Sequence, residues 1–235
     1  MDNNEVTILI ASEEHLRYVD TILHTISEAA KVRGTGIAKR DPEYVKKKIT
    51  EGKAIIALAG GEFAGFCYIE SWGHNKFVAN SGLIVHENFR GHGLARDIKR
   101  KAFELSRTRY PDAKIFGLTT GLAVMKINSE LGYKPVTFSE LTDDEDFWKG
   151  CQSCVNYDIL LRTSRKHCLC TGMLYDPAWE KKKVADVQPQ KKEKVYERWL
   201  QFKRHVFLRG KEGENDAKSG AGSKSLFHRL LSVFA

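Results

Sequence analysis

Apolar and polar residues follow two different periods along the first part of the chain. Short runs rich in β-branched residues predict four strands, at residues 5–11, 54–59, 63–72 and 77–86. Gly60-Gly61 joins the second and third of these as a hairpin. Between the first two strands, apolar residues at helical spacing predict a helix from Ser12 to Gly34 and a shorter one from Asp41 to Gly52.

Helices and strands alternate in the next part of the chain. An amphipathic helix is predicted at Leu94–Arg109, then a strand at Lys114–Thr119 and a helix at Leu122–Leu131 that Gly132 ends. An apolar run at Tyr157–Leu161 predicts a last strand. Three antiparallel-type strands that lead into β-α-β units imply one mixed sheet with helices on its faces, which is an α/β (α+β) fold.

The net charge of the chain is confined to its C-terminal part. The 235 residues carry 38 Lys and Arg against 30 Asp and Glu, a formal net charge of +8. Residues 1–180 hold 24 basic and 24 acidic side chains, so residues 181–235 account for the whole excess. The neutral part gives no electrostatic reason to bind a polyanion, and we expect no specific nucleic-acid partner.

The chain lacks the sequence features of membrane or secreted proteins. No stretch reaches the roughly 18 uncharged apolar residues of a transmembrane helix. Residues Met1–Glu5 are polar and acidic, without the apolar segment of a signal peptide. We therefore expect a soluble, cytoplasmic protein whose cysteines are reduced.

The junction between the fourth strand and the long helix carries the most informative motif. It reads Arg90-Gly-His-Gly-Leu-Ala95 and follows the apolar run Leu83-Ile-Val85. Glycine permits positive φ and a close approach of the backbone to a ligand, and the N–H groups of a helix start attract phosphate. A phosphate-binding loop and an ordinary strand-to-helix turn both fit. The third glycine of a dinucleotide motif is missing, because Arg96 stands in its place.

This motif resembles the R/Q-x-x-G-x-G/A signature of the GCN5-related N-acetyltransferases (GNAT), with Arg90, Gly93 and Ala95 at the signature positions. The order of elements is similar too, and Leu131-Gly132-Tyr133 matches the family's L-G-Y/F turn. The resemblance covers roughly residues 5–162. It implies a mixed, mostly antiparallel sheet flanked by helices, and an enzyme that transfers an acetyl or other short acyl group from acyl-coenzyme A directly to a primary amine.

The resemblance also implies which residues hold acetyl-CoA. Backbone groups of Leu83, Ile84 and Val85 would bind the pantetheine arm. The pyrophosphate would be held by Phe89, Arg90, Gly91, His92, Gly93, Leu94 and Ala95. Asn128 stands where many members carry a tyrosine that protonates the leaving thiolate, and an amide is no such proton donor. Asn128 is thus a candidate catalytic and coenzyme A-binding residue that leaves the identity of the acid open.

The catalytic base is open as well. Many members place a glutamate on the fourth strand, but residues 77–85 contain no carboxylate. Glu70 and His74 are the nearest substitutes by position, and we take Glu70 as the candidate base. Both are also compatible with exposed polar positions at a strand edge. A non-catalytic acyl-CoA sensor is therefore the alternative to an enzyme.

Residues 118–141 resemble the C-terminal half of glutamate N-acetyltransferases, the N-acetylglutamate synthases. The segment Gly36–Arg40 lies where that group has a basic residue, so Lys39 and Arg40 are candidates for binding the acceptor's carboxylates. A solvated charge pair before a helix fits equally. An amino acid such as glutamate is the favoured acceptor, ahead of another small amine or a protein amine.

Four of the five cysteines lie within twenty residues, as Cys151-x-x-Cys154 and Cys168-x-Cys170. Four thiolates at this spacing are able to form a structural zinc site, with His167 as a substitute ligand. Reduced, partly buried cysteines without metal are the alternative. The fifth cysteine, Cys67, is expected in the core.

The sequence divides into an acyltransferase domain at residues 1–162, a cysteine-rich segment at 146–180 that overlaps the last strand, and a basic tail at 181–235. In the tail, one apolar stripe on a basic helix is formed by Val195, Trp199, Phe202 and Val206, and residues 225–235 predict a second short helix. Such helices dock on their own domain or a partner subunit, or lie on an anionic surface. A homodimer is one assembly that fits.

Overall fold

The computed structural model describes residues 5–33, 40–180 and 197–201. The chain divides into two compact units, residues 1–182 and 183–235. Of the second unit only the helical residues 197–201 are described, so Val195, Phe202, Val206 and the second helix predicted in the tail lie outside the described residues. Within the described ranges, no helix combines the length and the apolar composition that crossing a membrane requires.

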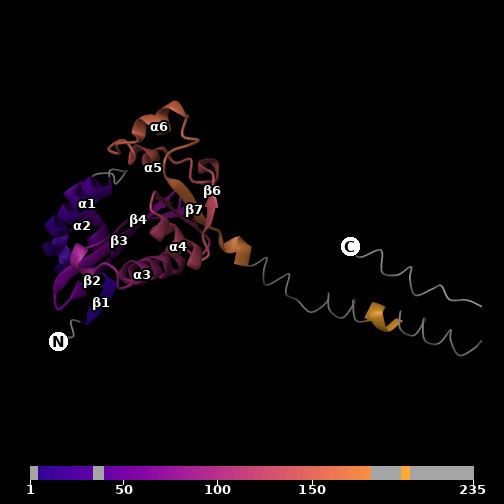
Figure 1. Cartoon of the computed structure of the whole chain (residues 1–235), viewed down its shortest axis with the longest axis horizontal. Helices are drawn as coiled ribbons and strands as arrows, with labels where there is room; N and C mark the ends of the chain where they lie inside the picture. Colours follow the sequence, from indigo (N-terminus) through magenta and orange to yellow (C-terminus); the bar gives the residue numbers. More distant parts are fainter. Residues whose placement is uncertain (1–4, 34–39, 181–196, 202–235) are drawn as a thin grey trace, which may run out of the picture. The chain divides into compact units, whose positions relative to one another are not determined.

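A sheet of seven strands forms the centre of the first unit, in the order β1-β2-β3-β4-β5-β7-β6 (Figure 1). The strands are β1 Val6–Ile10, β2 Ala54–Ala59, β3 Glu62–Trp72, β4 Phe77–Val85, β5 Lys114–Thr119, β6 Lys134–Val136 and β7 Thr171–Tyr175. β4 and β5 pair in parallel, and all other neighbouring strands pair antiparallel. The predicted mixed, mostly antiparallel sheet is confirmed.

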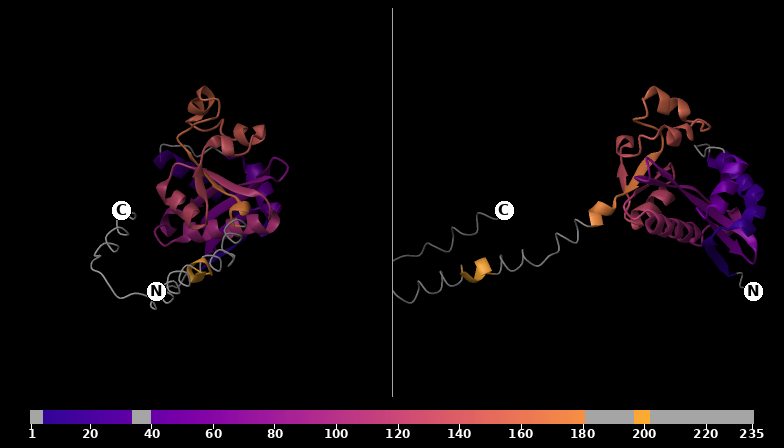
Figure 2. Two further views of the ribbon diagram at one scale, coloured as in Figure 1. Left: turned by 90° about the vertical axis from the view of Figure 1, so that its right-hand side faces the viewer. Right: turned by 180° about the vertical axis from the view of Figure 1, so that it is seen from behind.

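Helices cover both faces of this sheet (Figure 1 and Figure 2). They are α1 Val19–Arg33, α2 Pro42–Thr50, α3 Leu94–Arg109, α4 Leu122–Glu130, α5 Glu145–Lys149 and α6 Tyr157–Arg162. α1 and α2 pack on the face that carries Ile56, whereas α3 packs on the face of its neighbour Ile55. In β5 the same alternation separates Phe116, which faces α5 and α6, from Ile115, which faces α3 and α4.

β4 and β5 run together for only a short distance. Their parallel register pairs Phe77–Ala79 with Lys114–Phe116, and both strands continue beyond these three pairs. From Asn80 and Gly117 onward the two strands separate. The sheet therefore has an opening near its middle.

Gly82 determines the course of β4 at this opening. The register with β3 shifts here, from Ser81 opposite Tyr68 to Ile84 opposite Phe66. Gly82 has a φ of +67°, and a Cβ at this position would lie 2.6 Å from Cε1 of Tyr68. The left-handed conformation and the lack of space both require glycine. Such a bulge bends the strand that carries it, which fits the separation of β4 from β5.

The end of the first unit differs from the sequence prediction. Tyr157–Leu161, predicted as a strand, is helix α6, and the sheet is completed instead by β6 and β7. Five largely apolar residues fit either period. Here Leu160 is buried beside Trp148 while Leu161 is exposed. A smaller difference is that the helix predicted from Ser12 begins as a 3₁₀ helix before α1.

Candidate functional site

A cavity of about 570 Å³ lies where β4 and β5 separate. Residues 81–84 and 117–119 of the two strands form the edges of the opening. Tyr44 of α2 lines the cavity from one face of the sheet, and Lys99 of α3 and Asn128 of α4 line it from the other. The cavity therefore passes through the sheet and connects its two helical layers.

This cavity brings together residues that come from separate motifs of the sequence. Its walls include Arg40, Glu70, Leu83, Ile84, Asn128, Cys151, Cys154, Cys168 and Cys170. Val85 and the loop residues 89–95 continue from β4 but do not line the cavity. Lys39 lies outside the described residues.

The loop before α3 has the conformation expected of an anion-binding helix start. Gly91 and Gly93 have φ values of +90° and +84°, and Gly93 is the N-cap of α3. Among the described residues, no atom lies within 4 Å of a Cβ placed at either glycine, so the backbone conformation rather than crowding requires glycine. Nε of Arg90 donates to the carbonyl oxygen of Val85 at 3.0 Å and ties the loop to the end of β4.

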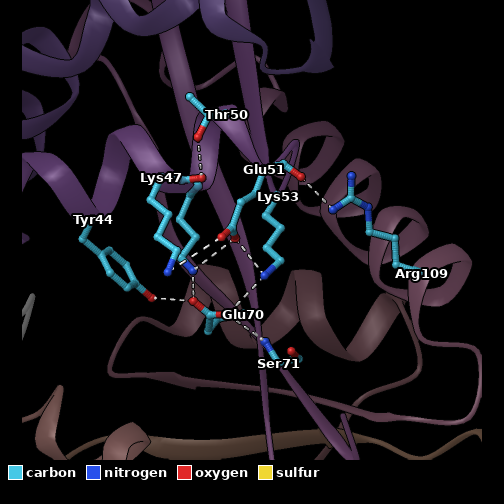
Figure 3. Close-up of polar contacts among 9 residues, drawn as sticks. Tyr44, Lys47, Thr50, Glu51, Lys53, Glu70, Ser71 and Arg109 are labelled. Carbon is cyan, nitrogen blue, oxygen red and sulfur yellow. Dashed lines mark hydrogen bonds and ion pairs between the residues drawn. The ribbon is translucent and has the colours of Figure 1, made fainter. Parts of the chain in front are cut away.

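Glu70, the candidate base, is held in a polar network in the cavity wall (Figure 3). One carboxylate oxygen accepts from the Tyr44 hydroxyl at 3.2 Å and is ion-paired with Lys48. The other accepts from the N–H of Ser71 at 3.2 Å and lies 3.7 Å from Nζ of Lys53. Both oxygens are engaged, so Glu70 would have to exchange one of these contacts to accept a proton.

Arg40, the candidate acceptor ligand, is placed by the start of α2. Asp41, followed by a proline, caps this helix by accepting from the N–H groups of Glu43 and Tyr44 at 2.8 and 3.1 Å. Next to this cap, Nε of Arg40 donates to the Tyr68 hydroxyl at 2.7 Å. A guanidinium in a cavity wall is suited to a carboxylate ligand.

Three buried polar atoms in the cavity residues have no hydrogen-bond partner among the described residues. They are Nε1 of Trp72, Oδ1 of Asn128 and Nδ2 of Asn156. A buried polar atom that is left unpaired is destabilising. A ligand that reached any of these three atoms would relieve an unpaired group.

Tyr68 and Lys99 also line the cavity, and neither was predicted from the sequence as a site residue. An aromatic residue in a strand is ordinary, so no signal marked Tyr68. Lys99 falls three positions before Ala102 and seven before Ser106, on the buried side of α3. A lysine at an inward position of an amphipathic helix is a signal that could have identified it.

The four clustered cysteines gather at one end of the cavity without forming a metal site. Burial and the neighbouring thiols of Cys154 and Cys168 raise the pKa of Cys151 to about 11. Burial, followed by the neighbouring thiols, raises the pKa of Cys170 to about 12. Within the described residues, which include all four cysteines and His167, no three His, Cys, Asp or Glu side chains are arranged to hold a metal ion.

The zinc prediction is therefore not supported. The two cysteine pairs flank helix α6, in place of the strand predicted between them. Cys151, Cys168 and Cys170 pack against the apolar cluster of Trp148 and Leu160. Cys67 is buried in the core, as predicted.

Residues 23–123 match the acetyltransferase (GNAT) family. A thialysine N-epsilon-acetyltransferase of Caenorhabditis elegans is 27% identical over 147 residues, which are 60% of this chain and 88% of that protein.

Two solved structures are similar in fold. An N-acetylglutamate synthase from Neisseria gonorrhoeae, complexed with coenzyme A and N-acetyl-glutamate, has a TM-score of 0.53 at 13% identity. The match covers 74% of this chain and only 36% of the synthase chain. The diaminobutyrate acetyltransferase EctA from Paenibacillus lautus, in complex with L-2,4-diaminobutyric acid and coenzyme A, has a TM-score of 0.51 at 12% identity. That match covers 74% of this chain and 96% of EctA.

The thiol pKa values predict slow alkylation. At pH 7.5 Cys151 and Cys170 should react with iodoacetamide far more slowly than glutathione in the same solution, because a raised pKa leaves little thiolate. Their rates should rise up to about pH 11 to 12 and should not change with a chelator. Residue-resolved mass spectrometry measures both. Reaction at the rate of glutathione at neutral pH, or reaction that appears only after chelation, would contradict this description of the thiols.

Proposed function

The chain carries an acetyltransferase domain of the GNAT family at residues 23–123, and from this premise we propose that it transfers an acetyl group from acetyl-CoA to the amine of an amino acid. The observation that carries the proposal is the cavity that passes through the sheet between β4 and β5. Such a passage lets a thioester and an amine approach each other from opposite faces. Holding two reactants in this way raises their effective concentration.

Coenzyme A occupies the α3 side in this proposal. The positive-φ glycines at the start of α3 fit a pyrophosphate on the helix N-terminus. Beyond Ala79 the backbone of β4 is not paired with β5, so Leu83, Ile84 and Val85 are suited to hydrogen bond an extended pantetheine arm as an added strand would. Residues 89–95, which do not line the cavity, would hold the diphosphate outside it.

The transfer itself is a direct displacement. The acceptor nitrogen attacks the thioester carbonyl carbon, the C–N bond forms, the C–S bond breaks, and coenzyme A leaves as a thiol. In this proposal a backbone N–H at the Gly82 bulge stabilises the carbonyl oxygen as it gains negative charge, because the register shift interrupts the regular β3–β4 pairing there. An acyl-cysteine intermediate is disfavoured, because a pKa of about 11 leaves Cys151 protonated at neutral pH.

The acceptor binds on the α1 and α2 side. Arg40 offers a guanidinium to a carboxylate there, and an amino group would exchange for one of the lysine contacts of Glu70. One cation and one anion in the same wall match an amino acid better than a simple amine. Glutamate, diaminobutyrate and thialysine are the acceptors to test first, since the similar proteins are named for them or for their acetylated product.

Thiol release from acetyl-CoA, measured across a panel of amines, tests this function. We expect turnover with at least one amino acid and much less with the amine that lacks its carboxylate. Coenzyme A binding is measured in parallel by calorimetry. Binding without thiol release on any amine would overturn the proposal in favour of an acyl-CoA sensor, and a preference for protein amines would overturn the choice of acceptor.

Gly93→Val should weaken coenzyme A binding by about tenfold or more, because a β-branched residue disfavours positive φ and would project into the diphosphate position. Gly61→Val is the matched control. Gly61 has a φ of +88° in the β2–β3 hairpin, so its variant carries similar backbone strain outside the proposed site. Unchanged coenzyme A affinity in folded Gly93→Val protein would reject the loop assignment.

Arg40→Met should raise the KM for the amino acid by about 10- to 100-fold, as expected for losing a charged hydrogen bond of about 1.5–3 kcal/mol. Coenzyme A affinity should be unaffected. Arg17→Met is the control, because Arg17 makes a similar bond to a tyrosine hydroxyl, that of Tyr18, at an exposed position. Equal effects of the two substitutions on KM would rule out Arg40 as an acceptor ligand.

A further inference from the structure

Lys99 of α3 is a buried ammonium group without an anionic partner. The residue is 2% exposed, and among the described residues it makes neither an ion pair nor a hydrogen bond. Lys48, which is equally buried, is ion-paired with Glu70. An ammonium that loses its hydration without a carboxylate beside it is destabilising. The cation–π contact of Nζ with the Tyr133 ring, at 5.2 Å, offsets only part of this cost.

The Lys99 ammonium reaches the opening between β4 and β5. Lys99 lines the cavity, and its Nζ lies 3.9 Å from the position that a Cβ of Gly117 would occupy. The same position is 3.4 Å from the carbonyl oxygen of Asn80 in β4. The ammonium thus lies beside Gly117, at the level where β4 and β5 separate and a thioester would pass through the sheet.

The groups around Lys99 are neutral and bonded to one another. The Tyr133 hydroxyl donates to Oδ1 of Asn80 at 2.9 Å, and Nδ2 of Asn80 donates to Ser106 at 2.7 Å. Among the described residues, the titratable groups that face Lys99 are the Tyr133 ring, 5.2 Å from Nζ, and the Cys67 thiol of β3. Burial raises the pKa of Cys67 to about 11 and that of Tyr133 well above its ordinary value, so both are neutral near pH 8.

Lys99 itself has the proton affinity of a thiol. Burial lowers its pKa to about 8, which the Cys67 thiol offsets only in part. An ordinary lysine has a pKa of about 10.4 and an alkyl thiol one of about 8.5. Lys99 is thus mostly protonated at pH 7. Because its pKa is close to that of a thiol, transfer of its proton to a thiolate changes the free energy little. This match favours general acid catalysis.

We propose that Lys99 is the proton donor to the departing coenzyme A thiolate, the role that Asn128 is unable to fill; this inference rests on the acetyltransferase function proposed above. Asn128 lines the same cavity and has an unpartnered Oδ1, but its amide donates no proton in a displacement. As the C–S bond breaks, the sulfur receives the proton of Nζ and leaves as the thiol. The acceptor nitrogen loses one proton to solvent, and the neutral Lys99 amine takes one from solvent before the next turnover.

Lys99→Met tests this role in the full chain. We expect kcat to fall by about 100-fold or more, with coenzyme A affinity changed by less than about threefold. The melting temperature should be unchanged or higher, because an uncompensated charge is removed. Wild-type kcat should decline above about pH 8 as Lys99 loses its proton, and the variant should lack this decline. Lys101→Met, at an exposed position of the same helix, is the control and should behave as wild type.

Lys99→Arg separates proton donation from charge. Arginine keeps the positive charge but holds its proton too tightly to act as an acid, so the proposal predicts low kcat for this variant too. Recovery of activity in Lys99→Arg, or wild-type kcat in Lys99→Met, would overturn the assignment. A loss restricted to acyl donors that carry a carboxylate would overturn it as well. Lys99→Leu provides the same comparison if the methionine variant does not fold. Absence of turnover by the wild type on every amine would instead refute the proposed function.

Discussion

β4 and β5 share three residue pairs and then separate, which leaves backbone groups of both strands without a strand partner in the middle of the sheet. Backbone polar groups in a protein interior need hydrogen bonds, so an interrupted sheet is stable only where something else meets them. The chain forms this interruption with a bulge at Gly82, whose φ of +67° and closeness to the Tyr68 ring strongly favour glycine. The cavity that Lys99 lines lies at this interruption, and the proposed approach of two substrates from opposite faces depends on it.

The two buried lysines show how differently the chain treats charge on the two sides of this opening. On the α2 side, Lys48 is neutralised by Glu70 within a network that also engages Tyr44 and Lys53. On the α3 side, Lys99 faces only neutral groups among the described residues. Burial lowers the pKa of both lysines to about 8, so the two differ in having or lacking a carboxylate partner rather than in pKa. We infer that the first arrangement positions an acceptor and the second handles a proton.

Sequence alone predicted the parts of the fold that depend on local pattern. The strands up to residue 119 and helix α3 were predicted from apolar period, and the loop at Gly91 and Gly93 from glycine spacing. β6, with three residues, has no measurable period, and β7, with five, takes its place in the sheet from pairing with distant residues of β5 and β6, so neither strand was predicted. α6 was misassigned because Tyr157–Leu161 is too short to distinguish the two periods.

Individual residues of the candidate site were predicted from the sequence, but their proximity in one cavity was not. Arg40, Glu70 and Asn128 lie far apart in sequence and line one cavity. The cysteine spacing predicted a zinc site, but spacing does not report where helix α6 directs the thiols, and they pack on an apolar cluster instead. Lys99 was passed over because its meaning depends on the absence of a carboxylate nearby, which is a property of the folded chain.

A crystal structure of this chain with a non-hydrolysable acyl-CoA analogue tests the account most directly. We expect the pantetheine arm along Leu83–Val85, the diphosphate at Gly91–Ala95, and the sulfur in the opening within hydrogen-bonding reach of Nζ of Lys99. A sulfur on the far side of α3 from this opening, or an analogue bound elsewhere while β4 and β5 stay apart, would contradict the claim that the interrupted sheet is the site of acyl transfer.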